Sequence, residues 1–384
     1  MIDETSRILS DLIAFPTVSA DSNLEMIAYL ANRLEDCGAS VDVLFDASGQ
    51  KANLFATLGP EADGGIVLSG HSDVVPVTDQ DWSSDPFTMV ERDGRLYGRG
   101  TCDMKGFIAA TLAIAPQFAG QIGKRPLHFA FTYDEEVGCV GAGHLVQTLR
   151  DREIRPRLAL IGEPTSMRII EGHKGCHEYT TRFQGLEGHG SDPSRGVNAV
   201  EYAVRYVSRL LDLRLDLQQR TPPDSRFDPP WTTLNIGALN GGSAHNVIAS
   251  KAQVDWEMRP VQQADADHVK DTMARYCHDV LLPAMRAVYP EASIDTEVVG
   301  EVAGLVPTTR NEARDIMAEL LGSKSAELVP FGTEAGLFQA LGMDVVVCGP
   351  GSIAQAHKAD EYLAIDQLGQ CLSVLDQLAA RLAD

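Results

Sequence analysis

A short apolar run followed at once by a histidine and an aspartate most restricts how this chain can fold. Ile66, Val67 and Leu68 form the run, and His71 and Asp73 follow it two residues apart. If the run is a buried strand, these two side chains lie on one face at its carboxyl end. Open α/β sheets bind ligands at that edge, so the pattern favours an α/β fold with a site there. An imidazole in such a place is a good metal ligand, and a neighbouring carboxylate can orient its ring.

Further acidic and imidazole side chains recur at predicted strand ends and helix starts. They are Asp103 before an apolar helix, Glu135 and Glu136 after one strand, Glu163 after another, and His357 in a polar segment. Each has a structural alternative: Asp103 as a helix N-cap, the glutamate pair as a solvated strand end, and the other two as ordinary loop residues. Together with His71 they offer nitrogen and oxygen ligands for two divalent metals, and zinc, cobalt and manganese all suit such ligands.

This set of residues suits hydrolysis. Two metals roughly 3.5–4 Å apart can share one water, lower its pKa toward about 7 and polarise a carbonyl group. One carboxylate would bridge the metals, and one would remain to carry the proton from the water to the leaving nitrogen. Adjacent glutamates allow one of them to bind metal while the other faces the water.

Strands and helices alternate along the first part of the chain, which predicts an α/β domain. The predicted strands there are 41–45, 53–58, 66–69, 95–98, 126–132 and 158–161, and the predicted helices are 3–14, 22–36, 107–118 and 141–149. Strands at 177–185, 232–238, 251–259 and 292–298 with helices at 197–213 and 265–287 then follow the split βαβ order of a ferredoxin-like module. Residues 218–230 are expected to form a loop within it. A helix at 310–321, a strand at 344–348 and a last helix at 362–382 resume the first pattern. We therefore expect a catalytic domain in two parts, 1–175 and 300–384, interrupted by an inserted domain at 176–299.

Composition limits the partners. The 384 residues carry a net charge of -22, which argues against binding to nucleic acid or an anionic membrane. Most of these charges fit a solvated surface, and a smaller share can favour a cationic substrate. The seven cysteines form no C-x-x-C pair, which suits a reducing compartment. With no signal peptide pattern and no membrane-length apolar run, we expect a soluble, cytoplasmic protein.

Several ordered segments resemble motifs of the dinuclear zinc aminoacylase and carboxypeptidase family. They are Gly70–Pro76, Tyr97–Gly106, Asp134–Glu136, Gly162–Thr165 and His357–Glu361. The resemblance extends over nearly the whole chain. It implies a mixed-sheet, zinc-peptidase-like catalytic domain with an inserted ferredoxin-like α+β domain that acts as a lid and as a dimerisation surface.

The resemblance also implies a role for each residue of the set. Asp103 would bridge two metals, which the resemblance implies are zinc, with cobalt or manganese also suitable. His71 and Glu163 would complete one metal site, and Glu136 and His357 the other. Glu135 would be the general acid and base that activates the bridging water, Asp73 would orient His71, and the peptide bond from Asp103 to Met104 would be cis.

Three residues of the inserted domain match the family's substrate-contacting positions. His189, in the segment Gly185–Ser191, would reach the partner subunit's active site and stabilise the oxyanion, although it can also be read as a loop histidine. Asn246, in Gly241–Ile248, would contact the substrate. Arg259 would bind the substrate's α-carboxylate with its two-pronged guanidinium. The resemblance thus implies a homodimer that forms through the inserted domain.

The segment Phe331–Gln339 most resembles the acetylornithine deacetylase branch of the family. Glu334 within it is expected either to bind a substrate ammonium or to stabilise a helix N-terminus. The resemblance implies a small N-acylated amino acid as substrate, namely N-acetyl-L-ornithine, hydrolysed to L-ornithine and acetate in arginine synthesis. The alternatives are a broader N-acyl-amino-acid deacylase, a desuccinylase or a dipeptidase on the same metal site, and a non-catalytic dimeric binding protein.

Overall fold

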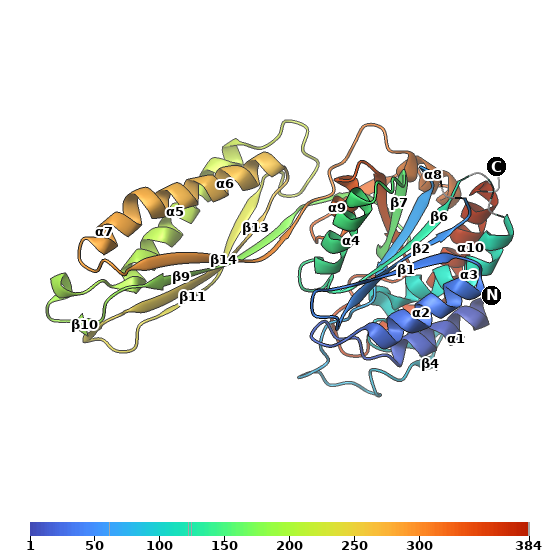
Figure 1. Ribbon diagram of the computed structural model, residues 1–384, viewed down its shortest axis with the longest axis horizontal. Coiled ribbons are helices and arrows are strands. Elements are labelled where there is room, and N and C mark those ends of the chain that lie inside the picture. The colour runs from blue at the N-terminus through green and yellow to red at the C-terminus, as the bar shows by residue number, and fades with distance from the viewer. Residues whose placement is uncertain (61, 122, 124, 383–384) are drawn as a thin grey trace. The chain divides into compact units, whose positions relative to one another are not determined.

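The computed structural model describes residues 1–60, 62–121, 123 and 125–382, and divides the chain into two compact units (Figure 1). Unit 1 comprises residues 1–172, 307–328 and 333–384, and unit 2 comprises 173–306 and 329–332. The expected boundaries after residues 175 and 299 lie near these bounds but do not coincide with them. Unit 2 is thus an insertion into the chain of unit 1.

Unit 1 is built on a mixed sheet of eight strands. Its order is β1 (Ser40–Phe45), β2 (Ala52–Leu58), β6 (Leu127–Thr132), β3 (Ile66–His71), β7 (Leu158–Pro164), β16 (Asp344–Gly349), β8 (Ile169–His173) and β15 (Ala326–Val329). The central strands β6, β3, β7 and β16 are parallel, and the flanking pairs that contain β1, β2 and β8 are antiparallel. The expected mixed α/β fold is therefore confirmed, and the parallel strands bring their carboxyl ends to one edge.

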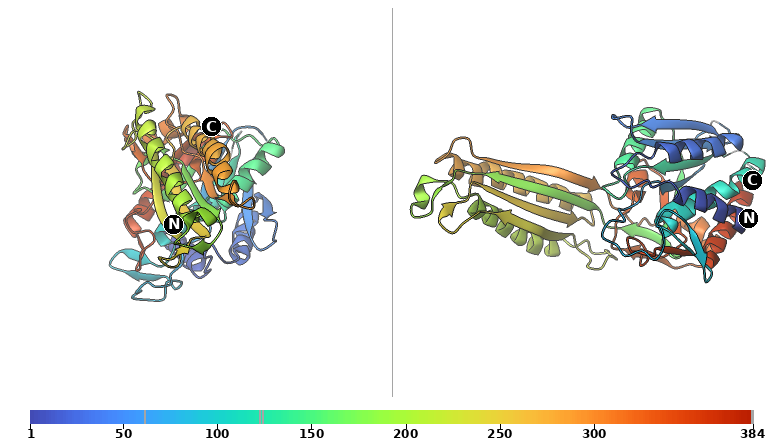
Figure 2. Two further views of the ribbon diagram at one scale, coloured as in Figure 1. Left: turned by 90° about the vertical axis from the view of Figure 1, so that its left-hand side faces the viewer. Right: turned by 90° about the horizontal axis from the view of Figure 1, so that it is seen from below.

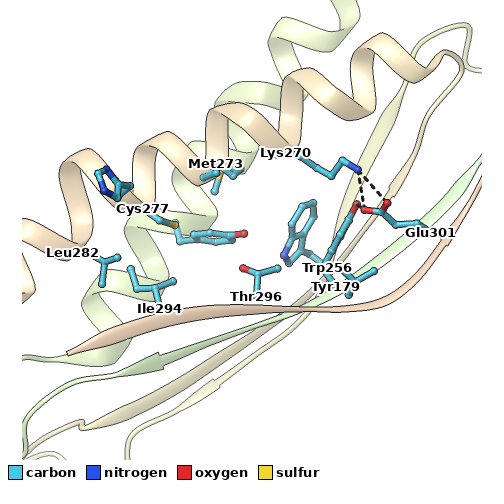
Figure 3. A pocket seen from close by; sticks show the side chains of 13 residues that line it. Tyr179, Trp256, Lys270, Met273, Cys277, Leu282, Ile294, Thr296 and Glu301 are labelled. Carbon is cyan, nitrogen blue, oxygen red and sulfur yellow. Dashed lines mark hydrogen bonds and ion pairs between the residues drawn. The ribbon is translucent and has the colours of Figure 1, made fainter. Parts of the chain in front are cut away.

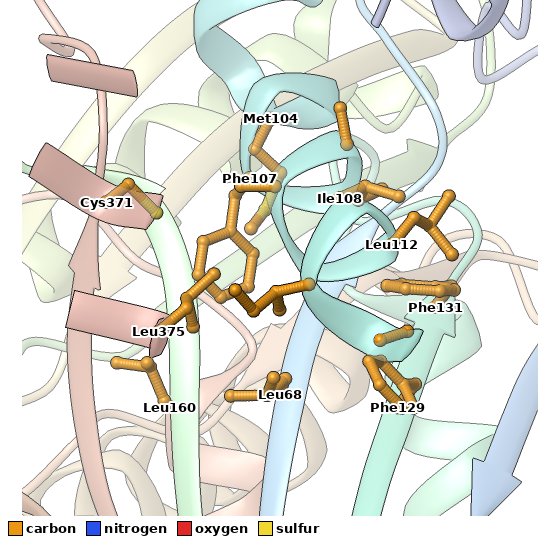
Figure 4. Close-up of a cluster of buried hydrophobic side chains, with 14 of the residues drawn as sticks. Leu68, Met104, Phe107, Ile108, Leu112, Phe129, Phe131, Leu160, Cys371 and Leu375 are labelled. Carbon is orange, nitrogen blue, oxygen red and sulfur yellow. The ribbon is translucent and has the colours of Figure 1, made fainter. Parts of the chain in front are cut away.

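Helices cover both faces of this sheet. They are α1 (Ile2–Ile13), α2 (Leu24–Asp36), α3 (Gly106–Gln121), α8 (Glu312–Leu321) and α10 (Ile365–Leu382) on one face, and α4 (Val140–Asp151) and α9 (Ala335–Gln339) on the other (Figures 1 and 2). Helix α3 is apolar around most of its surface because it lies between the sheet and the helices α1 and α10. Its Phe107 and Ile108 meet Leu68, Leu160 and Leu375 in the main core (Figure 4).

Unit 2 contains a separate four-stranded antiparallel sheet. The strand order is β11 (Thr233–Gly241), β13 (Lys251–Arg259), β9 (Cys176–Gln184) and β14 (Ser293–Val302). Helices α5 (Ala199–Gln219) and α6 (Gln263–Tyr276) cover one face (Figure 2). This is the expected strand–helix–strand–strand–helix–strand order. Two short strands, β10 (Gly188–His189) and β12 (Val247–Ile248), form a ribbon of their own.

Between α6 and the edge strand β14 there is a pocket of about 390 Å³ (Figure 3). The rings of Tyr179 and Trp256 stack at its floor with centroids 4.4 Å apart. The Lys270 ammonium pairs with Glu301, which also accepts the Tyr179 hydroxyl at 2.6 Å. These polar groups are therefore already paired with one another.

One expected helix is confirmed with an irregular turn inside it, and another needs correction. The helix expected at 265–287 is α6, a π-helical turn (Cys277–Leu281) and α7 (Leu282–Arg286). Pro283 lies just after that turn and has no amide hydrogen to donate to the preceding turn. The helix expected at 362–382 begins only at Ile365, because 362–364 form strand β17, which pairs with β5 (Arg95–Tyr97) beside β4 (Val90–Arg92). Tertiary pairing outweighs the local helical pattern there.

Candidate metal centre

The expected metal ligands of unit 1 come together in one cluster. Asp103 is central, since its Oδ1 lies 3.0 Å from Nε2 of His71 and its Oδ2 lies 3.3 Å from Nε2 of His357. The Oε1 atom of Glu163 lies 3.9 Å from Nε2 of His71, and both oxygens of Glu136 lie 3.1 Å from Nε2 of His357. One carboxylate thus faces two imidazoles, each with a further carboxylate beside it.

The parallel strands explain why these residues meet. His71 is the last residue of β3, Glu163 lies near the end of β7, and Glu136 follows β6. Asp103 lies in the turn Thr101–Lys105 before α3, and its peptide bond to Met104 is cis, as expected. Its side chain faces the histidines, so the N-cap alternative is not what the structure contains. His357 is an exposed loop residue after β16 with a positive φ of 63°.

Asp73 connects His71 to the loop that contains Glu135 and Glu136. The Nδ1 atom of His71 lies 2.9 Å from the main-chain oxygen of Asp73 and 3.5 Å from its carboxylate. That carboxylate accepts the backbone N–H groups of Glu135 at 3.0 Å and Glu136 at 3.3 Å, and the Ser19 hydroxyl at 2.7 Å. Asp73 therefore holds the main chain of both glutamates in addition to one imidazole.

Glu135 lies beside the cluster, and among the described residues no histidine forms a hydrogen bond or an ion pair with it. The Cys139 thiol donates to its Oε1 at 3.4 Å, and the Lys51 ammonium binds the preceding Asp134 carboxylate at 2.6 Å. Asp134 has a positive φ of 53°, so this ion pair stabilises a tight turn that aims Glu135 inward. These contacts leave Glu135 available for proton transfer.

The cluster carries an excess of buried negative charge. Burial raises the pKa of Glu135 to about 8, and neighbouring Glu136 and Asp103 add to this effect. Burial and the Asp103 charge also raise the pKa of Glu163 well above its usual range. Hydrogen bonds to Asp103 and Glu136 raise the pKa of His357 to about 10. These shifts are expected where buried carboxyl groups lie close together and protonated histidines offset part of their negative charge.

The donor set fits divalent metal ions. His71, Asp103 and Glu136 offer ligand atoms that all lie within 4.8 Å of one another, and so do His71, Glu135 and Glu163. Within the part of the chain that the structure describes, Oε1 of Glu163 is a buried oxygen with no hydrogen-bond partner. A buried carboxylate oxygen left without a donor is costly unless a cation binds it. Imidazole and carboxylate ligands suit zinc, cobalt and manganese.

Glu334 occupies the N-cap position of α9, as the helix-terminus alternative expects, but its surroundings do not fit a substrate ligand. It is fully buried, and its oxygens accept the hydroxyls of Ser69 at 2.5 Å and Thr132 at 2.7 Å. It makes no side-chain capping bond to α9. A carboxylate enclosed in this way is unavailable to a substrate ammonium. It ties the start of α9 to β3 through Ser69 and to the end of β6 through Thr132.

Unit 2 separates its three expected substrate-contacting residues. His189 ends β10 and Asn246 directly precedes β12, and beside this ribbon the Gly190 N–H donates to the Asn246 carbonyl at 2.7 Å. The His189 ring is exposed, and its hydrogen bonds among the described residues are with Ser191, whose hydroxyl lies 2.7 Å from Nδ1. Arg259 is the last residue of β13, at the opposite end of the sheet from the ribbon, and its guanidinium is bound by Glu257 (Figure 1). One copy of unit 2 therefore does not bring the three together.

Several residues that support the cluster were not singled out by sequence reasoning. Three of them, Ser19, Lys51 and Gln80, contact residues that are distant in the sequence, and no local sequence pattern indicates such contacts. A fourth, Cys139, donates to Glu135 four residues before it. Arg99 and Glu361 lie within quoted motifs, yet only the structure shows that they pair.

Comparisons with known proteins agree with this geometry. The model of peptidase family M20/M25/M40 matches residues 67–381. The acetylornithine deacetylase of Shigella sonnei strain Ss046 is 37% identical over 364 residues, which cover 93% of this chain and 92% of that protein. An M20 family metallo-carboxypeptidase from Sulfolobus solfataricus has a TM-score of 0.75 and 16% identity, with 99% of each chain covered. A dinuclear metal binding peptidase of the M20 family from Bacillus subtilis has a TM-score of 0.64 and 17% identity, with 99% of this chain and 98% of that chain covered.

Proposed function

Because this chain belongs to peptidase family M20/M25/M40 and is a hydrolase, we propose that it removes the acetyl group of N-acetyl-L-ornithine to give L-ornithine and acetate. The observation that carries the chemistry is Asp103, whose two oxygens each face one histidine, with Glu135 beside them. The similarity to an acetylornithine deacetylase over most of both chains supports the substrate.

Two divalent cations, with zinc the first choice, would be held by five residues: His71, Asp103, Glu136, Glu163 and His357. When bound, the cations supply Lewis acidity that lowers the pKa of water and polarises a carbonyl oxygen. Asp103 would be shared between the two sites, since each of its oxygens faces a different imidazole.

Glu135 would move the proton. It would take a proton from the attacking water and deliver it to the amine nitrogen as the amide bond breaks. Asp73 fixes the main chain of Glu135 through the N–H contact at 3.0 Å, so the carboxylate stays aimed at the reaction centre.

A homodimer would explain the separation of residues within unit 2. If His189, Asn246 and Arg259 all act on one substrate, the first two must come from a different chain than Arg259, since they lie at opposite ends of one sheet. Helix α5 supports this proposal because Val204, Leu211 and Leu215 are exposed on one face. Strand β11 is also an edge strand of its sheet among the described residues. Sedimentation equilibrium should give a dimer, and a monomer at all concentrations would contradict the proposal.

Two sequence properties bear on where the reaction takes place. Cys102, Cys139, Cys348 and Cys371 are buried free thiols, which supports a reducing compartment such as the cytoplasm. Across the described residues, no helix has the length and apolar character needed to cross a bilayer.

The test is hydrolysis of N-acetyl-L-ornithine by zinc- or cobalt-loaded protein, beside N-succinyl-diaminopimelate, a dipeptide and a panel of acyl amino acids. Glu135→Gln should lose activity by a factor of about 10² to 10⁴ while it retains metal. The exposed Glu153→Gln is the matched control and should behave as wild type. A preference for another amide would keep the mechanism and replace the substrate, and full activity of Glu135→Gln would refute the assignment of the base.

A further inference from the structure

The loop that follows β3 contains a glutamine with contacts on both sides of its amide. The Nε2 atom of Gln80 donates to the main-chain oxygen of the metal-site residue His357 at 3.0 Å. Its Oε1 accepts from Nη2 of Arg99 at 2.7 Å and from the Trp82 indole N–H at 3.1 Å. Because both partners of Oε1 are donors only, the amide has a single favourable orientation, with its nitrogen toward His357.

Arg99 gives this contact a rigid base. Its side chain is fully buried, its guanidinium lies over the Trp82 ring, and its Nη1 pairs with Glu361 at 2.6 Å. The same nitrogen donates to the main-chain oxygen of Lys358 at 3.3 Å. A guanidinium held on three sides has little freedom to move, so it fixes the oxygen of Gln80 in turn.

Glu361 extends the connection to the central aspartate. Its Oε1 accepts the backbone N–H groups of Cys102 at 2.9 Å and Asp103 at 3.1 Å, and its Oε2 binds Arg99. Glu361 also lies four residues after His357 in the sequence. The buried Arg99–Glu361 ion pair therefore contacts the main chain at Asp103, through Glu361, and close to His357, through the bond from Arg99 to Lys358.

We propose that Gln80 is a positioning residue for His357 and that it sets the affinity of the metal site formed by His357, Glu136 and Asp103. His357 belongs to no helix or strand, is exposed and has a positive φ, so its own segment constrains the ring weakly. The contact from Gln80 to its carbonyl fixes the peptide from which the ring projects. Contacts of this kind typically change metal affinity or activity by a factor of about 10 to 100.

The inference rests on the proposed function, because it assumes that the cluster binds two metals. The test is a titration of metal-free protein with Zn²⁺ in competition with a chelating dye, which gives two dissociation constants. In Gln80→Ala, one constant should rise on the order of tenfold while the other stays at the wild-type value. Gln147→Ala, on the exposed face of α4, is the matched control and should leave both constants unchanged.

A second variant identifies the contact responsible. Gln80→Glu keeps an oxygen for Arg99 and Trp82 but has no N–H for the His357 carbonyl, so it should lose affinity as Gln80→Ala does. Loss in the alanine variant alone would overturn the proposal, because the contact with Arg99 would then be the important one. Wild-type constants in both variants would overturn it as well. If the wild-type protein itself fails to bind two metals, the proposed function fails instead.

Discussion

Replacing Gly162 by alanine would add a methyl group where the ring of Phe107 already lies. The added carbon would be 2.0 Å from Cγ and Cδ1 of Phe107, whereas ordinary carbon contacts are about 3.5–4.0 Å. Phe107 is 1% exposed and lies in the main core, so the ring has no free space to enter (Figure 4). A displacement of about 1.5 Å must therefore be shared between the ring and strand β7.

The expected cost follows from overpacking. Forcing extra atoms into a packed core lowers the free energy of unfolding by about 1–3 kcal/mol, and this contact belongs at the upper end of that range, about 3 kcal/mol. Phe107→Ala alone should cost about 3–5 kcal/mol because it leaves a cavity. In the double variant the new methyl group enters that cavity, so its own cost should nearly vanish. The coupling free energy between the two changes is therefore expected to be about 3 kcal/mol.

Urea unfolding followed by circular dichroism measures the four free energies of the cycle. Gly162 directly precedes Glu163, which we propose as a metal ligand, so Gly162→Ala should also weaken metal binding, and Phe107→Ala in the same chain should restore part of it. Additive effects in the double variant, or a Gly162→Ala protein as stable as wild type, would refute this packing argument.

Three further outcomes are expected. First, burial lowers the pKa of His128 and of His173 to about 4, below the usual 6.5, so the unfolded chain binds protons before the folded chain does as the pH falls. The free energy of unfolding should therefore decline between about pH 6.5 and 4, by up to about 3 kcal/mol per histidine. Urea unfolding at several pH values checks this. Second, chelation of divalent metal should abolish hydrolysis and lower the melting temperature, and Zn²⁺ or Co²⁺ should restore both; activity that survives exhaustive chelation would rule out the proposed mechanism. Third, since Glu334 is enclosed by Ser69 and Thr132, Glu334→Gln should not change the preference for N-acetyl-L-ornithine over N-acetyl-L-norvaline, which lacks the side-chain amine; a selective loss with acetylornithine would show that Glu334 reaches the substrate.

The sequence predicts that several of the clustered side chains lie together because some of them mark the ends of buried strands, whereas metal binding by these residues stays a prediction. His71 and Glu163 end apolar runs, and parallel strands place such ends side by side whatever the details of the loops. The general fold follows from the same alternation of elements. Asp103 and His357 depend more on the family resemblance, since neither ends a strand.

What the sequence does not predict depends on contacts between distant segments. The sequence favours Glu334 as a substrate ligand or as a glutamate at a helix start, and it does not show that the hydroxyls of Ser69 and Thr132, 265 and 202 residues away in the chain, enclose its carboxylate. The first residues of the expected last helix become strand β17 because β5 offers a partner. No sequence pattern indicates Gln80, since its proposed positioning role depends on contacts with Arg99 and His357.

The insertion has a consequence for the order in which a growing chain can fold. All but four residues of unit 2 form one continuous stretch, 173–306, so its sheet can form as soon as that stretch has been synthesised. The sheet of unit 1 must wait, because β16 at residues 344–349 inserts between β7 and β8, which were made long before. Until then, the edge of β7 that β16 later covers has no partner, and unpaired edges invite association with other chains. A nascent chain is therefore most exposed to misassociation after unit 2 has formed and before β16 leaves the ribosome.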